Sequence, residues 1–130
     1  MDRGYEEAQL PEGPSDFGLI AFVANLSCLY PTYVRGQADL AAGQGATAAA
    51  EFQRIIDHSG IVWNCWTGAL AHLGVARANA LQAKTAQGAD ADAARVRAIT
   101  AYKSFLDLWK DADPDIPILK QAKAEYAKMQ

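Results

Sequence analysis

The apolar residues of this chain recur with the period of a helix, and the clearest case lies between positions 96 and 109. Large apolar side chains follow one another there at steps of 3, 3, 4 and 3. Steps of three and four place side chains on one face of an α-helix, so this stretch predicts an amphipathic helix that buries its apolar face. The members of the stripe are Val96, Ile99, Tyr102, Leu106 and Trp109.

Further helices are predicted on both sides of this stripe, with glycine, proline and aspartate between them. Glycine ends helices and proline suits their first turn, so the boundaries are placed at Pro31, Gly43, Gly60 and Asp115. The resulting helical ranges are 17–29, 31–42, 47–58 and 67–86, the stripe helix up to 109, and a last helix after 115. The apolar segment 61–67 is expected to be a loop that packs on the core or on another chain.

Composition supports the same fold class as periodicity does. Alanine, which has the highest helix propensity, is the commonest apolar residue, and no stretch alternates apolar and polar residues as a strand does. With 51% apolar and 21% charged residues, the chain has enough apolar surface to build a core. We therefore predict an all-α protein of about six helices, with a flexible acidic leader at 1–16 and one helical domain at 17–130.

Charge and hydropathy argue against two classes of partner. The net charge is −3 at pH 7, and five acidic residues lie within the first 16 positions against a single arginine. A chain without a basic face offers no electrostatic footprint to nucleic acid or to an anionic lipid surface. The most apolar run, at 19–30, is shorter than the ~20 residues that a membrane span needs. We expect neither nucleic acid nor a membrane as a partner.

The two cysteines, Cys28 and Cys65, are too few for a disulfide framework. Their default state is a free thiol in a reducing compartment, so the sequence favours a cytoplasmic location. Together with His58 and His72 they offer the ligand types that zinc prefers, but they show none of the close spacings of a zinc site. A buried free thiol and a core histidine are the favoured interpretation, and we expect no metal and no cofactor.

A catalytic role is also weighed against simpler interpretations. Cys65 and His72 lie seven positions apart, but a nucleophilic pair needs a third orienting group in a concave site, which short helical repeats rarely enclose. Asp111, Asp113 and Asp115 alternate like a cation-binding loop but lack the glycine and glutamate that complete one. Turn and capping aspartates explain them better. We expect no enzymatic activity.

A short pattern occurs twice in the chain: a glycine on one predicted helix, then an Ala-x-x-x-aromatic pair on the next. The two copies are Gly36, Ala48 and Phe52, and Gly74, Ala98 and Tyr102. This pattern resembles the tetratricopeptide repeat, which implies a stack of antiparallel helix hairpins. The second copy departs from the family, because 24 residues rather than 12 separate its glycine from its alanine. The difference corresponds to about three extra helical turns.

Three longer segments carry a second resemblance. Residues 30–38, 68–78 and 108–128 are similar to the C-terminal repeat region of large bacterial serine/threonine protein kinases and of related multidomain regulators. None of the catalytic motifs of a kinase accompanies these segments. The resemblance implies a non-catalytic regulatory region of a longer protein, or a free-standing relative of one.

The expected function is protein–protein interaction, as an adaptor, scaffold or regulatory module, and the alternative left open is a small-molecule sensor with a pocket between helices. The repeat resemblance implies a partner-facing surface on the first helix of each hairpin. Two indoles on one short segment add core or interface anchors. The candidate partner-binding residues are Tyr30, Tyr33, Gln37, Leu40, Val75, Asn79, Trp63 and Trp66.

Two further expectations concern the same surface. Arg35 and Arg77 are expected to pair within the chain, with Asp39 or Asp57, rather than with a partner. The predicted partner-facing positions are mostly small and apolar, and soluble monomers rarely leave such a strip bare. We expect the helix at 17–29 to cover part of it and a second copy of the chain, in a homodimer, to cover the rest.

Overall fold

The computed structural model describes residues 28–62 and 65–130 of the chain, and within these two ranges it contains helices and no strand. The helices are α3 (Tyr30–Ala41), α4 (Gly45–Asp57), α5 (Ser59–Val62), α6 (Trp66–Thr85), α7 (Gly88–Leu108) and α8 (Pro117–Ala127). The prediction of an all-α fold with about six helices is confirmed. The acidic leader at 1–16, nearly all of the helix predicted at 17–29, and Trp63 lie outside the described residues.

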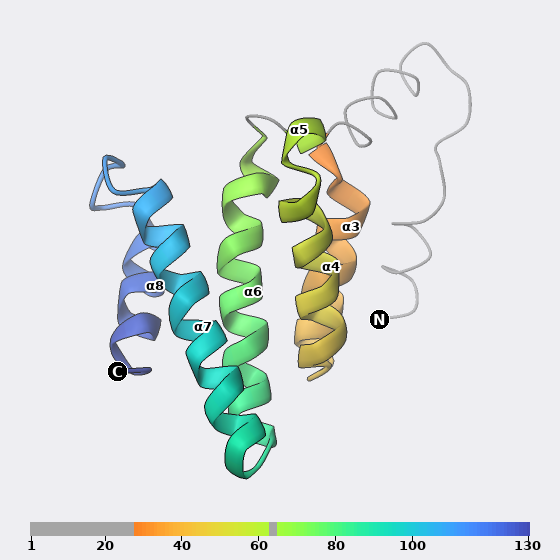
Figure 1. Cartoon of the computed structure of the whole chain (residues 1–130). Coiled ribbons are helices and arrows are strands. Elements are labelled where there is room, and N and C mark those ends of the chain that lie inside the picture. Colours follow the sequence, from red (N-terminus) through yellow and green to blue (C-terminus); the bar gives the residue numbers. More distant parts are fainter. Residues whose placement is uncertain (1–27, 63–64) are drawn as a thin grey trace.

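The helices form two antiparallel hairpins, α3–α4 and α6–α7, and α8 lies beside α7 (Figure 1). Glycines make the two hairpin turns possible. Gly43, just after α3, has φ 77°, and Gly88, at the start of α7, has φ 57°. A side chain is strained in this left-handed region, whereas glycine adopts it freely. Both turns fall where the sequence predicts a break.

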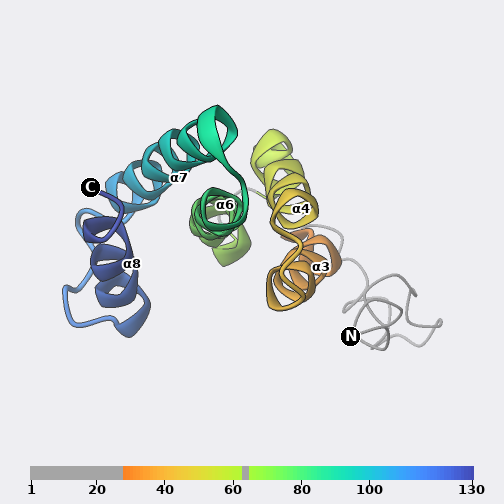
Figure 2. The ribbon, with the colours of Figure 1, turned by 90° about the horizontal axis from the view of Figure 1, so that it is seen from below.

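Helix α6 is the centre of the structure. It packs against α4 on one side and against α7 on the other, as a view along the helix axes shows (Figure 2). The second hairpin is much longer than the first, with helices of 20 and 21 residues against 12 and 13. Because α6 packs between α4 and α7, it takes part in two hydrophobic cores. One is shared with α3 and α4, and the other with α7 and α8.

The first core is built around the Phe52 ring, which is completely buried. Gly36 of α3 and Gly74 of α6 approach this ring from two sides. A Cβ atom added at Gly36 would lie 2.8 Å from the far end of the ring, and one added at Gly74 would lie 2.5 Å from Cγ. Both distances are shorter than carbon atoms tolerate. The repeated glycine positions of the sequence are therefore points of close contact, where any larger residue would force the Phe52 ring to shift.

The second core corrects the stripe predicted on α7. The buried residues of α7 are mostly small, namely Ala94, Ala98 and Ala101 together with Tyr102 and Phe105. Val96, predicted to be inside, is 63% exposed, and Ile99, Leu106 and Trp109 are only partly buried. The reason is that the alanines allow α7 to lie close against α6, so that the inner face is centred on positions 94, 98, 101, 102 and 105 rather than on the predicted stripe.

Cys28 and Cys65 form a disulfide, with Cα atoms 5.6 Å apart. The prediction of free thiols is therefore wrong. Cys28 lies two residues before the first residue of α3 and Cys65 immediately precedes α6, so the bond ties the starts of the two hairpins together. Next to it, the buried Thr67 hydroxyl donates a hydrogen bond to the Cys28 carbonyl oxygen at 2.6 Å. Cys28 and Cys65 are 37 positions apart in the sequence, and they meet because α3 and α6 start at the same end of the molecule.

Two predictions about helix starts are also wrong. The segment 61–67 is not simply a loop, because α5 ends at Val62 and α6 begins at Trp66. The last helix begins at Pro117 rather than directly after Asp115, whose carboxylate pairs instead with Lys120 at 2.7 Å. Proline fits the first turn of a helix because that turn leaves its amide nitrogen unpaired.

Candidate functional site

A hollow lies over α6, between the walls formed by α4 and α7. Its volume is about 650 Å³, and α6 contributes its floor. The hollow exists because α4 and α7 both pack on α6 but have little or no contact with each other. The residues that line it are Ala46, Ala49, Ala50, Gln53 and Ile56 of α4, His72, Val75, Asn79 and Gln82 of α6, and Val96, Arg97, Thr100, Ala101 and Ser104 of α7.

A second hollow of about 760 Å³ continues the first toward the disulfide end of the molecule. Ile56 and His72 line both hollows, so the two form one trough along the same face of α6. From Trp66 at one end to Gln82 at the other the trough is about 24 Å long, at about 1.5 Å per helical residue. The second hollow adds Ile55, Ser59, Val62, Cys65, Trp66, Gly68, Ala69, Leu108 and Trp109 to the lining.

The two walls of the trough differ in character. The α4 wall is low, because alanines at positions 46, 49 and 50 leave its backbone close to the open space. The α7 wall is higher and apolar at both ends, where Val96 is 63% and Leu108 58% exposed. Trp66, at the disulfide end, is 50% exposed. Exposed apolar side chains that border a concave surface mark a site of association more often than a bare surface.

One charged side chain, Arg97 of α7, stands among the residues that line the first hollow. Asn79 of α6, only 4% exposed, fixes its position. The Arg97 Nε donates a hydrogen bond to the Asn79 Oδ1 at 2.8 Å, and the Asn79 Nδ2 donates to the Val75 carbonyl oxygen at 2.9 Å. Both ends of the Asn79 amide are thus satisfied within the described residues. A buried amide holds an arginine at the edge of an otherwise uncharged hollow.

His72 lies where the two hollows meet. It is partly buried, and this burial lowers the pKa of its imidazole below the usual range. The ring is therefore neutral at pH 7 and adds polarity but no charge to the floor of the trough.

The structure separates the sequence-predicted site residues into two groups. Val75, Asn79 and Trp66 line the trough. The α3 residues Tyr30, Tyr33, Gln37 and Leu40 do not, since they lie on the far side of α4 or against α6. The site formed by the trough uses both α4 and α7, which sequence reasoning did not consider. The available signal was the group of alanines at positions 46, 48, 49 and 50, because small residues on a helix permit close approach.

The α3 residues instead form an aromatic cluster at the disulfide end. The Tyr33 ring packs edge-on against Phe52 and Trp66, with centroids 5.6 and 5.0 Å away. Tyr30 packs edge-on against Trp66 at 5.8 Å and is 43% exposed. Gln37 donates a hydrogen bond to the Tyr33 hydroxyl at 3.0 Å. Trp66 therefore joins this cluster on one side and faces the trough on the other.

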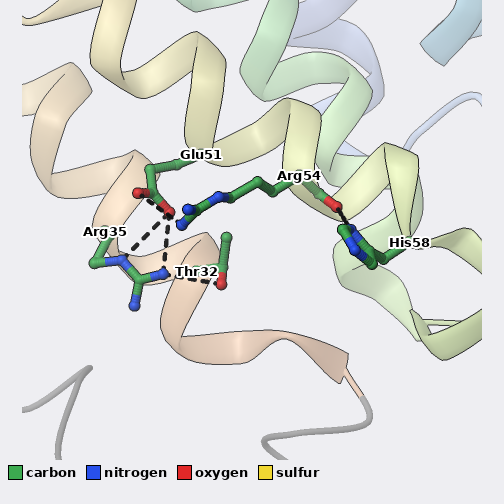
Figure 3. A network of polar contacts seen from close by, with 5 residues as sticks. All are labelled: Thr32, Arg35, Glu51, Arg54 and His58. Atoms are coloured by element: carbon green, nitrogen blue, oxygen red, sulfur yellow. Dashed lines mark hydrogen bonds and ion pairs between the residues drawn. The ribbon is translucent and has the colours of Figure 1, made fainter.

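Arg35 pairs within the chain, but not with the predicted aspartates. Its Nε and Nη2 donate to the Glu51 Oε2 at 3.3 and 3.1 Å, and Thr32 accepts a further hydrogen bond (Figure 3). Arg54 approaches the other Glu51 oxygen at 3.6 Å. This network joins α3 to α4, so Arg35 is occupied by structure rather than available to a partner.

Arg77 also pairs within the chain, with Glu125 of α8. Its Nε and Nη2 each donate to a Glu125 oxygen at 2.9 Å. The Tyr102 hydroxyl donates to the same carboxylate at 3.0 Å. Burial and the Glu125 carboxylate both raise the pKa of Tyr102, which keeps its proton and acts as a donor. This clamp joins α6, α7 and α8.

Asp39 is buried between α3 and α4, and its Oδ2 has no hydrogen-bond partner among the described residues. Burial raises the pKa of its carboxyl, and the nearby Glu51 adds to this effect while Arg35 opposes it. Asp39 lies away from the trough and contacts none of its lining residues through a hydrogen bond. We therefore treat it as a feature of the first hairpin.

The described residues contain no group of three or more His, Cys, Asp or Glu side chains that could hold a metal ion. The disulfide removes the thiolate that a nucleophile at Cys65 would need. None of the helices in residues 28–62 and 65–130 is long and apolar enough to cross a membrane. Comparison of this chain with protein-family models, curated proteins and solved structures finds no match.

Proposed function

We propose that this protein is a non-catalytic interaction module that binds a helix of a partner protein in the trough over α6. The observation that carries the proposal is the trough itself: a continuous, mainly apolar channel between two helical walls, long enough for a helix of about 16 residues. An amphipathic helix laid in such a channel is a recurring mode of protein recognition.

The lining supports a helix as the occupant. A helix with its side chains is about 10 Å wide, and the alanines of α4 lower one wall so that a second backbone can come close. Val75 and Ile56 on the floor, with Leu108 and Trp66 at the disulfide end, offer apolar contacts along the length of the trough. Burying such surfaces is the main source of association free energy.

The resemblance to tetratricopeptide repeats and to the repeat regions of bacterial kinases supports an interaction role. The trough includes the implied α6 positions Val75 and Asn79 but none of the implied α3 positions. A homodimer remains a second form of the same proposal, with a helix of another copy in the trough. Sedimentation of the full chain across a range of concentrations tests this form, because a species of 14.0 kDa throughout would exclude it.

We further propose an oxidising compartment for this protein. The expectation of a cytoplasmic location rested on two free thiols, and the Cys28–Cys65 disulfide removes that ground. Disulfides persist in oxidising compartments and are rare where glutathione keeps thiols reduced. Mass spectrometry of the protein alkylated directly from its source cell tests this proposal, since an alkylated Cys28 would contradict it.

A small-molecule sensor is the second candidate function. Its support is the first hollow, whose volume of about 650 Å³ falls within the range of ligand pockets. A ligand that binds only the native state raises the melting temperature. A metabolite that does so in the wild type, but not after Ala50→Trp fills the hollow, would favour this candidate over a helix.

The central proposal can be tested with a photo-crosslinking residue placed at Ala50, which is exposed and lines the trough. A matched probe at Ala124, which is exposed on α8 and outside the trough, is the control. We expect discrete crosslinked proteins from the Ala50 probe alone. Equal yields from both probes, or none from Ala50, would contradict binding of a protein in the trough.

A further inference from the structure

The position of Arg97 says more about the partner than the apolar lining does. It is the only Asp, Glu, Lys or Arg side chain among the residues that line the first hollow. The other residues that line this hollow are uncharged at pH 7, so Arg97 alone sets the sign of the charge there. Binding sites select partners by complementary charge, and a like charge at this point would be repelled.

The arginine is held in place rather than loosely attached. Its Nε is bonded to the Asn79 Oδ1 at 2.8 Å, and Asn79 is 4% exposed and fixed in turn by the Val75 carbonyl oxygen. This arrangement uses one guanidinium nitrogen and leaves the two terminal nitrogens for another acceptor. No acidic side chain of the described residues forms an ion pair with Arg97. The three arginines that do form ion pairs, Arg35, Arg54 and Arg77, lie outside the trough.

We propose that the partner helix carries an aspartate or glutamate that pairs with Arg97, a conclusion that rests on the proposed function. The two terminal nitrogens of a guanidinium match the two oxygens of a carboxylate, which gives the contact direction as well as strength. The Thr100 and Ser104 hydroxyls, which also line the hollow, already donate to carbonyl oxygens of α7, so the Arg97 guanidinium is the main donor that a carboxylate would find there.

The position of Arg97 also sets where this acidic residue lies. Asn79 is thirteen residues after Trp66 on α6, which corresponds to about 20 Å along the trough. The acidic residue therefore belongs near one end of the bound helix, and large apolar residues belong at the other end, against Trp66 and Leu108. The partner helix is polarised: acidic at one end and apolar three to four turns away.

A library of amphipathic helices displayed on phage tests this inference with the full chain as bait. Each displayed helix has about 16 residues, with apolar positions along one face and a randomised residue near each end. The bait variants are Arg97→Gln and Arg97→Glu. Arg95→Gln is the matched control, because Arg95 is exposed on the same helix but lies outside the trough. Circular dichroism checks that each variant is folded.

We expect the wild type and Arg95→Gln to enrich aspartate or glutamate at one end of the selected helices. Arg97→Gln should remove this preference and weaken binding of the selected helices about tenfold, as expected for a lost charge-assisted hydrogen bond. Arg97→Glu should reverse the preference toward lysine or arginine. The inference would be overturned if the selected helices carried no acidic residue. The proposed function would stand in that case if these helices bound the wild type but not the Ala50→Trp variant, in which the hollow is filled.

The remaining outcomes decide against the proposals in distinguishable ways. If every helix selected by the wild type also bound the Ala50→Trp variant, or if none were selected, the proposed function would fail. The inference of an acidic partner helix would fail with it. The Ala50 photo-crosslinker separates the other occupants. A crosslink to residues 17–27 of the same chain, or to a second copy, would replace a foreign partner by the protein itself and overturn the inference.

Discussion

The repeated sequence pattern places its aromatic residue in a different environment in each of the two hairpins. In the α3–α4 hairpin the ring is Phe52, which is fully buried between Gly36 and Gly74 and has no polar atom. In the α6–α7 hairpin the ring is Tyr102, whose hydroxyl bonds to Glu125 of α8 at 3.0 Å. The first hairpin is thus closed by shape and the second by a polar contact to a further helix.

The comparison shows how one pattern can serve two environments. A ring that lies between two helix backbones needs glycine on both sides, and it gains its stability from close packing alone. A ring that lies next to α8 has room for a hydroxyl and gains a hydrogen bond to a charged acceptor. The helices of the second hairpin are longer than those of the first. The face of α6 that lies between α4 and α7 is left uncovered, and it forms the floor of the trough.

The largest effect is expected from removing the ring of the first hairpin. Phe52→Ala should lower the free energy of unfolding by about 3–5 kcal/mol, because the cavity forms in a fully buried site. Chemical denaturation followed by circular dichroism measures the loss. Trp109→Ala should cost less, because Trp109 is only partly buried. Equal losses in the two variants would contradict the central place given to Phe52.

Reduction of the disulfide is expected to come next. It should cost about 2–4 kcal/mol, mainly because the unfolded chain regains the freedom of the loop between Cys28 and Cys65. Denaturation with and without a phosphine reductant measures this cost. The double variant with serine at both positions is the control, since it should be insensitive to the reductant. A wild type that is equally stable in both conditions would mean that the disulfide does not hold the two hairpins together.

The two glycines that contact Phe52 should differ from each other. Gly74→Ala is expected to cost about 1–3 kcal/mol through overpacking, because its Cβ would meet the fixed base of the ring at 2.5 Å. Gly36→Ala meets the far end of the ring at 2.8 Å, which can tilt away, and should cost less. Gly60→Ala is the control, since a Cβ there meets nothing within 4 Å. Thermal unfolding would contradict this account if Gly36→Ala were the more damaging change.

The clamp of the second hairpin is expected to contribute less. Glu125→Gln keeps the size of the side chain but removes the charge that Arg77 and Tyr102 share. The expected loss is about 1 kcal/mol, because Glu125 is one-third exposed and solvent weakens the ion pair. Hydrogen exchange at α8 measures it locally. If only α3 and α4 lost protection, the clamp would not be what holds α8.

The sequence predicts those features that depend on neighbours along one helix or on one type of residue. The all-α class and the turns at Gly43 and Gly88 belong to this group. An alanine-rich inner face gives little contrast between buried and exposed sides. The pattern of large apolar residues therefore places Val96 on the buried face of α7, although its side chain is 63% exposed.

Features that depend on residues far apart in the chain could not be predicted in this way. Cys28 and Cys65 meet only because α3 and α6 begin at the same end of the molecule. Arg97 and Asn79 are 18 positions apart and meet only because α6 and α7 pack side by side. The walls of the trough likewise come from two hairpins. Local pattern identifies each helix, whereas the candidate site arises from how the helices are assembled.

The smallest effect is expected from His72, which lies on the helix that the two hairpins share. Burial lowers the pKa of its imidazole in the folded protein, so as the pH falls the unfolded chain takes up a proton first. The stability that comes from the neutral ring is therefore complete above the pKa of the unfolded chain. It is lost as the pH falls through the lower pKa of the folded state. The loss should be no more than about a few tenths of a kcal/mol, because a partly buried ring stays partly solvated.

Denaturant unfolding of the wild type and of His72→Gln between neutral and mildly acidic pH isolates this contribution. Glutamine is polar and uncharged throughout. The free energy of unfolding of the wild type, minus that of His72→Gln, should therefore fall as the pH is lowered. A partner helix in the trough would bury His72 further and lower the pKa of its imidazole more. Binding should therefore weaken in acid in the wild type and less so in His72→Gln. If the wild type instead gained stability relative to His72→Gln as the pH was lowered, the folded protein would favour the charged ring. An acceptor in the trough would then stabilise the imidazolium.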